Sequence, residues 1–409
     1  MSALRLRVTM VNKYYWPPHI GGIEAVVRHL SEGLIEHADA QVRALVCNEG
    51  RERVTQTIAG VDVVRLSRQL SLSSAPVAVS LPFALSDELC RPAPPDVVNL
   101  HSPYPWGELS FLLARPDVPS VVLYHSDIVR QQRLLTAYRP FLERFLDAVD
   151  LIVASSPDMV RNSKFLAPRA EKCRVVPFGL PVERLSGTPA VRRRAAELRA
   201  AHGGRHIVLF VGRFVYYKGA DVLVRAMASV DADLVLIGRG ALERELRELA
   251  AAQGRAASTA FLDRQDDDEL AAWYQAADVL CLPSVARSEA FGLVQIEAHA
   301  AGTPVVSTDL PTGVPYANPD GVTGLTVPPG DTAALAAALN RLLGDDELRA
   351  RLGRQAQARA LSSFTIPRMV ERTLAVYAEA IERHARRRAQ SRGRAAAAPR
   401  ETGGKRGRV

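Results

Sequence analysis

The amino-acid sequence predicts an α/β protein of two doubly wound domains that face each other across a cleft. Strand-like and helix-like segments alternate through most of the 409 residues, and this alternation predicts parallel sheets covered by helices on both faces. The alternation breaks once, over residues 182–204, and then restarts. A prior of roughly 150 residues per domain also favours two or three domains for a chain of this length.

The first half of the chain predicts an N-terminal domain over residues 1–181. Apolar residues at helical spacing, among them Leu30 and Leu34, predict a helix over residues 23–37, and a second apolar stripe predicts a helix over 127–149. Strands are predicted for residues 4–11, 42–47, 61–66, 97–100, 120–124, 151–154 and 174–176.

Residues 182–204 contain glycine and proline breaks and a basic run, and we interpret them as an interdomain connection with a short helix. The alternation then predicts a C-terminal domain over residues 205–361. Residues 362–382 are predicted to form a helix that packs back on the N-terminal domain. The strands expected in the second domain are 206–211, 234–237, 260–262, 279–282, 304–307 and 324–327, and the helices are 219–229, 242–252, 331–343 and 346–361.

Composition excludes several classes of protein. Apolar residues make up 47% of the chain and charged residues 23%, which is too apolar for a disordered protein. Four cysteines stand far apart and form no CxxC pair, which argues against a zinc site or a disulfide scaffold and fits a reducing compartment. No run of 18 apolar residues is present, so we expect no transmembrane helix and a cytoplasmic location.

The net charge of +8 is concentrated at the C-terminus. Residues 383–409 carry ten Lys or Arg and one acid, which leaves 42 basic and 43 acidic residues in the rest of the chain. This segment lacks large apolar residues and is predicted to be a basic, disordered tail. It is either a solvated end or a region that attracts anionic lipid headgroups on the inner face of the cell membrane. No aromatic residues are interleaved for base stacking, so we expect no nucleic-acid partner.

Two glutamates flank one predicted helix start. Gly292 indicates that this helix begins near Leu293, so Glu289 lies in the preceding loop and Glu297 about one turn inside. The free N–H groups at Phe291, Gly292 and Leu293 then form an anion site with a carboxylate at either end. A nucleoside-diphosphate sugar suits this site, with its diphosphate at the helix and its two sets of hydroxyls on the carboxylates. The alternative is that acidic residues merely complement the helix dipole.

Two further loops follow strands. Arg213 and Lys218 place two cations after the strand that ends near residue 211, where they could stabilise a diphosphate leaving group; otherwise they are two surface cations. Gly21 and Gly22 at the first helix start would let a phosphate or sugar approach the backbone closely, although an ordinary strand-to-helix turn also explains them. Neither a Walker A loop nor a GxGxxG pattern is present, which disfavours a nicotinamide site.

An aspartate triplet, residues 266–268, imitates a metal-binding DxD motif. It directly precedes a helical segment, so we interpret Asp266 as the N-cap of that helix. No metal and no cofactor are therefore expected beyond the nucleotide-sugar donor itself.

In combination these motifs resemble the retaining glycosyltransferases of family 4, also called group 1, which have the GT-B fold of two Rossmann-like domains. The resemblance covers roughly residues 4–376 and rests on Glu289-x7-Glu297, the GRF…KG loop, the first-loop GGIE and the run VVPFGL at 175–180. It implies that the N-terminal domain binds the acceptor. The chain departs from the family pattern at two places. Residues 178–181 read Phe-Gly-Leu-Pro where the family has Asn-Gly-Val-Asp at the end of the last first-domain strand, and Ile366 replaces an aromatic residue.

The resemblance also implies roles for single residues. Glu297 would hold the nucleotide ribose, Glu289 the hydroxyls of the donor sugar, and His125 the transferred sugar. Further contacts would come from the side chains of Arg213 and Lys218 on the diphosphate and from the backbone of Phe291, Gly292, Leu293 and Val294.

The reaction so implied moves a hexose from a nucleotide sugar, with GDP-mannose or a GDP-deoxyhexose as the leading donor, to a hydroxyl of a glycan or polyprenyl-diphosphate-linked acceptor. Anomeric configuration is retained by same-face substitution. The texture of the chain is similar to bacterial mannosyl- and rhamnosyltransferases of surface-polysaccharide assembly. Two alternatives stay open, namely a nucleotide-sugar epimerase of the same fold and a non-catalytic protein that binds sugar nucleotides.

Overall fold

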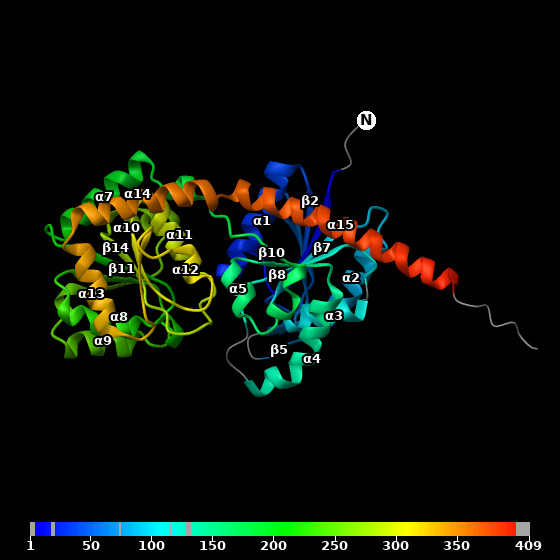
Figure 1. Cartoon of the computed structure of the whole chain (residues 1–409), viewed down its shortest axis with the longest axis horizontal. Coiled ribbons are helices and arrows are strands. Elements are labelled where there is room, and N and C mark those ends of the chain that lie inside the picture. The colour runs from blue at the N-terminus through cyan, green and yellow to red at the C-terminus, as the bar shows by residue number, and fades with distance from the viewer. Residues whose placement is uncertain (1–4, 18–20, 73–74, 115, 128–131, 398–409) are drawn as a thin grey trace, which may run out of the picture.

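The computed structural model describes residues 5–17, 21–72, 75–114, 116–127 and 132–397. Two α/β domains lie side by side, and the two long C-terminal helices run along one side of both (Figure 1). This arrangement confirms the predicted pair of doubly wound domains. In the part of the chain that is described, no helix combines the length and the apolar character needed to cross a membrane.

The first domain is built on a mixed sheet of eight strands in the order β10-β9-β8-β7-β1-β2-β4-β3. The order reverses between β1 and β7, and ligands of doubly wound sheets bind at such a switch point. Its strands are β1 (Arg7–Val11), β2 (Gln41–Cys47), β3 (Val54–Ile58), β4 (Val61–Leu66), β7 (Val97–Ser102), β8 (Ser120–Tyr124), β9 (Leu151–Ala154) and β10 (Cys173–Val175). A separate two-stranded sheet pairs β5 (Leu70–Leu72) with β6 (Ala75–Val77).

Strand β3 makes the sheet mixed, because it pairs antiparallel with β4, whereas the alternation predicted parallel strands alone. Ala59 and Gly60 connect the two strands with positive φ angles of 48° and 83°. Positive φ at both central residues of a two-residue loop is typical of the tight hairpin turn that matches strand twist. β3 lies at the sheet edge and is mostly exposed, so burial left no clear hydrophobic pattern in its sequence.

Among the described residues, five helices from the first half of the chain pack with the first sheet, and the last helix of the chain, described below, also packs on it. Val26, Leu30 and Leu34 of α1 are buried in one core cluster with residues of β1 and β2, as their spacing predicts. The five are α1 (Gly22–Ala38), α2 (Leu81–Leu89), α3 (Pro105–Ala114), α4 (Gln132–Ala148) and α5 (Pro157–Asn162).

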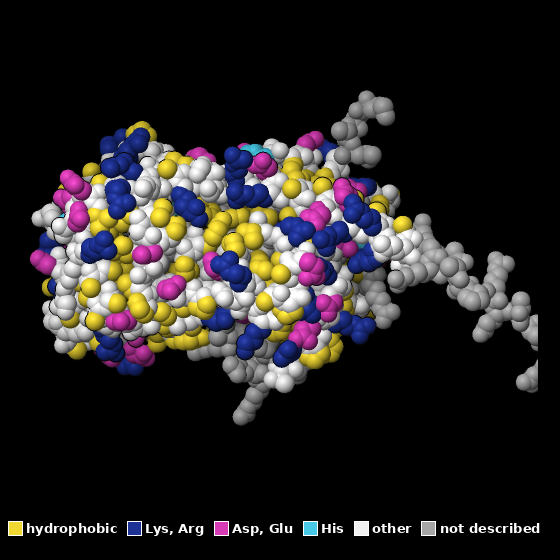
Figure 2. Space-filling view, in the orientation of Figure 1, with side chains coloured by type: hydrophobic (Ala, Val, Ile, Leu, Met, Phe, Trp, Pro, Cys, Tyr) yellow, Lys and Arg dark blue, Asp and Glu magenta, His cyan; other side chains and the backbone are white. Residues whose placement is uncertain are grey.

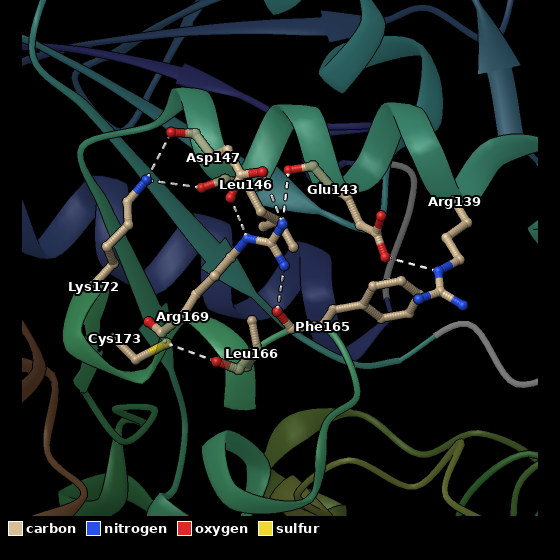
Figure 3. A network of polar contacts seen from close by, with 9 residues as sticks. All are labelled: Arg139, Glu143, Leu146, Asp147, Phe165, Leu166, Arg169, Lys172 and Cys173. Carbon is tan, nitrogen blue, oxygen red and sulfur yellow. Dashed lines mark hydrogen bonds and ion pairs between the residues drawn. The ribbon is translucent and has the colours of Figure 1, made fainter.

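Two cations hold the C-terminal end of α4 (Figure 3). The Arg169 guanidinium donates to both carboxylate oxygens of Asp147 at 2.6 and 2.9 Å and to the carbonyl oxygens of Phe165 and Glu143. The Lys172 ammonium donates to the carbonyl oxygens of Leu146 and Asp147. Cations that satisfy the last carbonyls of a helix also complement its dipole, so this end of α4 is firmly anchored.

The second domain has a parallel sheet of six strands in the order β13-β12-β11-β14-β15-β16. Counted from the start of the domain this order is 3-2-1-4-5-6, the order of a Rossmann fold, with its switch point between β11 and β14. The strands are β11 (Ile207–Val211), β12 (Asp233–Ile237), β13 (Thr259–Leu262), β14 (Val279–Leu282), β15 (Val305–Thr308) and β16 (Gly324–Val327). The helices are α8 (Ala220–Ala226), α9 (Glu243–Ala252), α10 (Asp267–Ala276), α11 (Leu293–Ala300), α12 (Val314–Ala317), α13 (Thr332–Leu343) and α14 (Asp346–Ser363).

Residues 182–204 contain the helix that was predicted for this connection, and the segment also packs on the second domain. They form α6 (Val182–Leu185) and α7 (Pro189–Ala201), and Val191, Ala195 and Leu198 of α7 share a core cluster with β11 and α10. The segment therefore belongs to the second domain. The buried face of α7 has only three residues in thirteen, and its run of arginines obscured that face in the sequence.

The last helix, α15 (Ile366–Ala397), packs on the first domain. Ile366 and Val370 lie against Gly33 of α1, where an added β-carbon would sit only 2.5 Å from Ile366 Cγ2. The chain before it is pinned as well, since the Leu180 N–H donates to the Phe364 carbonyl oxygen at 2.9 Å. The aliphatic Ile366 thus fits a close crossing of two helices.

The expected disordered tail is wrong for residues 383–397, which continue α15. Arg387 lies 3.1 Å from the buried carboxylate of Asp150, and Arg388 and His384 lie 3.0 and 3.1 Å from Asp117. Basic and acidic side chains are mixed along the face that α15 crosses (Figure 2). The helix extends because acids of the first domain compensate its charge, a contact that composition cannot reveal. Residues 398–409 lie outside the described residues.

Candidate active site

The loops at the two switch points face each other across the domain boundary. In the first domain these loops follow β1, β7 and β8, and in the second they follow β11 and β14. A β-carbon added to Gly22, at the start of α1, would lie 3.6 Å from Leu293 Cδ1 at the start of α11. Two of the helix starts predicted to bind anions are therefore neighbours, although they lie 271 residues apart in the chain.

Helix α11 begins at Leu293, as predicted, and Gly292 is its N-cap. Gly292 has φ 74° and ψ 70°, and an added β-carbon would clash with Leu282 at 2.5 Å, so this turn requires glycine. No side chain caps the helix, which leaves the first N–H groups, those of Leu293 and Val294, for a ligand. The side chains of Phe291 and Val294 pack in the core and do not contribute to this anion site.

Lys218 and Glu289 form a close ion pair at the mouth of these loops. The Lys218 Nζ lies 2.6 Å from Glu289 Oε2, and both side chains are largely buried, with 13% and 9% of their surface exposed. The Ser284 hydroxyl donates to the same carboxylate oxygen at 3.0 Å. Gly219 lets the two loops meet, because a β-carbon there would lie 2.0 Å from the Pro283 carbonyl oxygen. The site thus contains an ammonium group and a carboxylate that are already paired and largely shielded from solvent.

Glu297 lies one turn inside α11, where the sequence placed it, and the Tyr274 hydroxyl of α10 donates a hydrogen bond to its carboxylate. Burial raises the pKa of Glu297, while the bond from Tyr274 and the charge of Lys218 act in the opposite direction. Tyr274 is fully buried. Sequence reasoning missed it, because an aromatic residue on an amphipathic helix resembles ordinary core packing.

Arg213 follows β11 as predicted but does not join the Lys218–Glu289 pair. Its side chain is exposed, and its guanidinium donates to the Tyr217 hydroxyl at 3.0 Å. Burial lowers the pKa of Lys13, at the end of β1, and the charge of Arg213 lowers it further against the opposing effect of Glu24. Arg213 therefore lies near the first-domain loop, and cations from both domains border the cleft.

His125 follows β8 and is buried at the first-domain side of the cleft. Its ring stacks on Phe178 with centroids 5.5 Å apart, and Phe178 contacts Phe291 edge to face at 5.2 Å. Phe178, which departs from the family motif, thus fills the space between His125 and the start of α11 with its ring. Burial lowers the pKa of His125 to about 3, so its imidazole is neutral at physiological pH.

One ion pair also joins the domains beside the site. Arg287 Nη2 lies 3.2 Å from Asp127 Oδ2 and donates to the Asn162 carbonyl oxygen at 2.6 Å. The Tyr124 and Ser163 hydroxyls donate to the other oxygen of Asp127. Neither Arg287 nor Asp127 carried a signal in the sequence, because their partners are remote in the chain.

Two other residues singled out in the sequence lie at helix starts. Asp266 caps α10 as predicted, since its carboxylate accepts from the N–H groups of Asp268 and Glu269. Gly21 is the N-cap of α1 and is exposed at the cleft.

Comparisons with known proteins show which families the chain resembles. Residues 193–359 match the family described as "Glycosyl transferases group 1", and residues 20–184 match "Glycosyltransferase Family 4". The chain is 34% identical over 379 residues to the O-antigen chain mannosyltransferase C of Escherichia coli, covering 92% of this chain and 99% of the relative. It is 37% identical over 365 residues to the D-rhamnosyltransferase WbpZ of Pseudomonas aeruginosa, covering 88% and 92%.

Solved structures show the same fold at lower identity. A sucrose-phosphate synthase of Thermosynechococcus elongatus matches with a TM-score of 0.77 and 24% identity, over 92% of this chain and 99% of that one. The Anabaena protein HepE, solved in complex with UDP, matches with a TM-score of 0.72 and 20% identity, over 91% and 100%.

Proposed function

Because the chain belongs to the group 1 glycosyl transferases, we propose that it is a retaining enzyme that transfers mannose or a 6-deoxyhexose from a GDP-sugar. The acceptor is a hydroxyl of a glycan, carried on a lipid such as a polyprenyl diphosphate. Two relatives support the choice of sugar, since their names are O-antigen mannosyltransferase and D-rhamnosyltransferase and they align over nearly the whole chain. An active hexosyltransferase also fits better than a silent binding protein, because the charged residues of the site are intact.

The observation that carries the proposal is the Lys218–Glu289 pair beside the uncapped start of α11. The helix N–H groups and the Lys218 ammonium would receive the diphosphate, and Arg213 would reach it from its exposed position. Glu289 would accept hydrogen bonds from sugar hydroxyls and Glu297 from the ribose. Fixed charges of this kind stabilise a leaving diphosphate without a metal ion.

In the proposed reaction the acceptor oxygen forms a bond to the anomeric carbon as the bond from that carbon to the diphosphate oxygen breaks. Both events occur on the same face of the sugar, so configuration is retained. The departing diphosphate oxygen takes the acceptor's proton, which balances the charge of the step. Both glutamates are used for binding, so no nucleophilic carboxylate of the kind that retaining glycosidases use is required.

A donor panel tests this function. Purified protein is mixed with GDP-mannose, GDP-rhamnose, UDP-glucose or UDP-galactose and a synthetic lipid-linked glycan, and release of nucleoside diphosphate is measured. The GDP-sugars should give turnover that depends on acceptor, and NMR of the product should show retained anomeric configuration. Turnover with UDP-sugars alone, or an inverted product, would refute the proposal. Conversion of the donor without any acceptor would instead indicate the epimerase.

A lipid-linked acceptor implies contact with a membrane surface, and we place this contact on α4 rather than on the tail. The arginines beyond residue 382 whose side chains the structure describes are ion-paired with acids, namely Arg383, Arg386, Arg387 and Arg388. On α4, by contrast, Phe141 is 52% exposed and Arg144 is exposed near it. An exposed aromatic residue beside a cation is typical of helices that lie on anionic bilayers.

Co-sedimentation with vesicles of anionic lipid tests this placement. The double variant Phe141→Ser/Arg144→Glu should lose most of the binding and keep turnover on a short water-soluble acceptor. A chain ending at residue 397 should bind as the full chain does. If instead the shortened chain lost binding and the double variant kept it, the contact would lie in residues 398–409.

A further inference from the structure

Three buried side chains form a line beneath the site, from Asn99 through His101 to His125. Asn99 and His101 both belong to β7, two residues apart, so their side chains lie on the same face of the sheet. His125 directly follows the neighbouring strand β8, in which Tyr124 is paired with Ser102. The three residues are 0%, 2% and 4% exposed, so the amide nitrogen of Asn99 and the ring nitrogens of the two histidines find hydrogen-bond partners among one another.

The contact between the two histidines has the geometry of a true hydrogen bond. His101 Nδ1 and His125 Nε2 are 2.9 Å apart, and the ring planes differ by 18° with centroids 5.2 Å apart. A face-to-face stack would bring the centroids closer than this for the same contact between nitrogen atoms. The rings therefore lie nearly edge to edge, with one N–H in the plane of both rings.

Charge and the amide of Asn99 together decide which nitrogen carries that proton. Burial lowers the pKa of both imidazoles, so each is neutral and has one N–H. Asn99 Nδ2 lies 3.3 Å from His101 Nε2 and 3.1 Å from Met10 Sδ. The thioether accepts hydrogen bonds and cannot donate them, so the amide nitrogen, rather than the oxygen, belongs on this side.

The assignment then propagates along the line. His101 Nε2 accepts from Asn99, so its proton is on Nδ1, which donates to His125 Nε2. His125 must therefore carry its own proton on Nδ1. That nitrogen has no hydrogen-bond partner among the described residues.

We propose that Asn99 and His101 are positioning residues that hold His125 in the Nδ1–H tautomer, so that His125 offers a hydrogen-bond donor to a hydroxyl oxygen of the transferred sugar. The part that concerns the sugar rests on the function proposed above. A neutral donor of fixed direction orients the sugar without adding a charge beside the anomeric centre. The Phe178 ring packs against the His125 ring with an angle of 24° between their planes, so it restricts rotation of the imidazole.

The tautomers can be read directly by ¹⁵N NMR of protein labelled at histidine, without any ligand. Protonated and bare ring nitrogens have well-separated ¹⁵N shifts, and His101→Gln and His125→Gln variants assign the two rings among the nine histidines. Both rings should be Nδ1–H in the wild type. An Nε2–H tautomer at His125 would overturn the proposal, whatever the activity of the protein.

Asn99→Asp reverses the line by design, because a carboxylate at this position can only accept. His101 would then donate from Nε2 to the carboxylate introduced at position 99, so its Nδ1 would be unprotonated and would accept from His125 Nε2. The Nδ1 of His125, which faces the sugar in the proposal, would then carry no proton. We expect kcat to fall about ten- to a hundredfold, the scale of one lost hydrogen bond in a buried site, with nucleoside-diphosphate affinity unchanged. Met10→Leu tests the orientation of the amide separately, since it removes the acceptor that holds the Asn99 amide nitrogen on this side. It should mix the two tautomers of His101 and lower kcat less than Asn99→Asp does.

The two parts of the proposal fail separately. The wild-type tautomers could be as stated while the reversed His125 tautomer of Asn99→Asp leaves kcat unchanged. In that case the role of His125 as a hydrogen-bond donor to the sugar is wrong. If no donor is turned over by the wild type, the function proposed above is wrong, and NMR still decides the tautomers. If Asn99→Asp does not fold, Asn99→Ala replaces it and should mix the two tautomers of His101 and lower kcat.

Discussion

The Lys218 ammonium and the Glu289 carboxylate, 71 positions apart in the chain, meet at 2.6 Å and join the loops that follow β11 and β14. Breaking a buried ion pair by removing one partner is costly, on the order of 3–5 kcal/mol. In the proposed reaction the same two groups bind different parts of the donor. The pair therefore links stability to catalysis in this domain.

Lys218→Met should abolish measurable turnover and lower the free energy of unfolding, because it leaves the buried Glu289 carboxylate without its cation. The double variant Lys218→Met/Glu289→Gln should regain part of that stability and none of the turnover. Urea unfolding of the two single variants and the double variant measures the coupling. Additive losses of stability would mean that the two groups do not interact in solution.

The two glutamates should differ in their effect on nucleotide binding. Glu297→Gln should weaken free GDP and the donor alike, since the ribose is common to both, whereas Glu289→Gln should spare GDP and lower kcat. Tyr274→Phe should resemble Glu297→Gln in a milder form, since it removes the hydrogen bond to Glu297 and keeps the ring. Titration calorimetry with GDP measures all three, and equal losses for both glutamates would contradict the division of roles.

Chelation should not abolish turnover, because the leaving group is assigned to Lys218, Arg213 and the start of α11. Activity in excess EDTA, compared with added Mn²⁺ or Mg²⁺, measures this. Asp266→Ala should cost about 1 kcal/mol of stability through loss of the α10 cap, with kcat unchanged. An absolute metal requirement that disappeared together with Asp266 would show that the triplet binds metal after all.

Glu108 of α3 should make stability depend on pH. Its carboxylate accepts from the Ser102 hydroxyl at 2.7 Å and the Tyr104 N–H at 3.1 Å, and burial raises its pKa to about 7. In the unfolded chain the pKa of Glu108 is near 4.5. As the pH rises, Glu108 therefore ionises in the unfolded chain before it ionises in the folded protein, and the folded state loses stability between about pH 4.5 and 7.

Glu108→Gln removes this titration. The difference in unfolding free energy between wild type and variant should shift by about 3 kcal/mol across that window, with the wild type favoured at the acid end. Urea titrations at pH 5 and pH 7.5 measure it, and comparison with the variant cancels the other titrating groups. A constant difference would mean that Glu108 ionises normally in the folded protein.

Helix α15 should contribute to stability beyond residue 382. A chain ending at Glu382 loses Arg387, which is paired with the buried Asp150, and should be destabilised by about 1–2 kcal/mol, the penalty for a buried polar group left without its partner. A chain ending at Ala397 is the control and should melt with the full chain. Equal melting temperatures for all three chains would show that the extended helix does not stabilise the first domain.

Local signals in the sequence determined most of the fold and several residues of the site. The alternation of strands and helices gave two Rossmann-like domains, because an apolar period depends only on neighbouring residues. Gly292 predicted the start of α11 for the same reason, since only glycine adopts that backbone without strain. The positions of Glu289 and Glu297 relative to the helix followed from this single residue.

Only the tertiary structure decided which remote groups meet. In the sequence Tyr274 is indistinguishable from a core aromatic residue, and only the packing of α10 shows its hydrogen bond to Glu297. Phe178 departs from the family motif in the sequence, and only the structure shows its ring between those of His125 and Phe291. The basic tail looked disordered, because a sequence shows the cations of α15 without the first-domain acids that neutralise them. Hydrogen bonds and ion pairs act over a few ångströms in space, whatever the separation along the chain, so chain folding alone selects their partners.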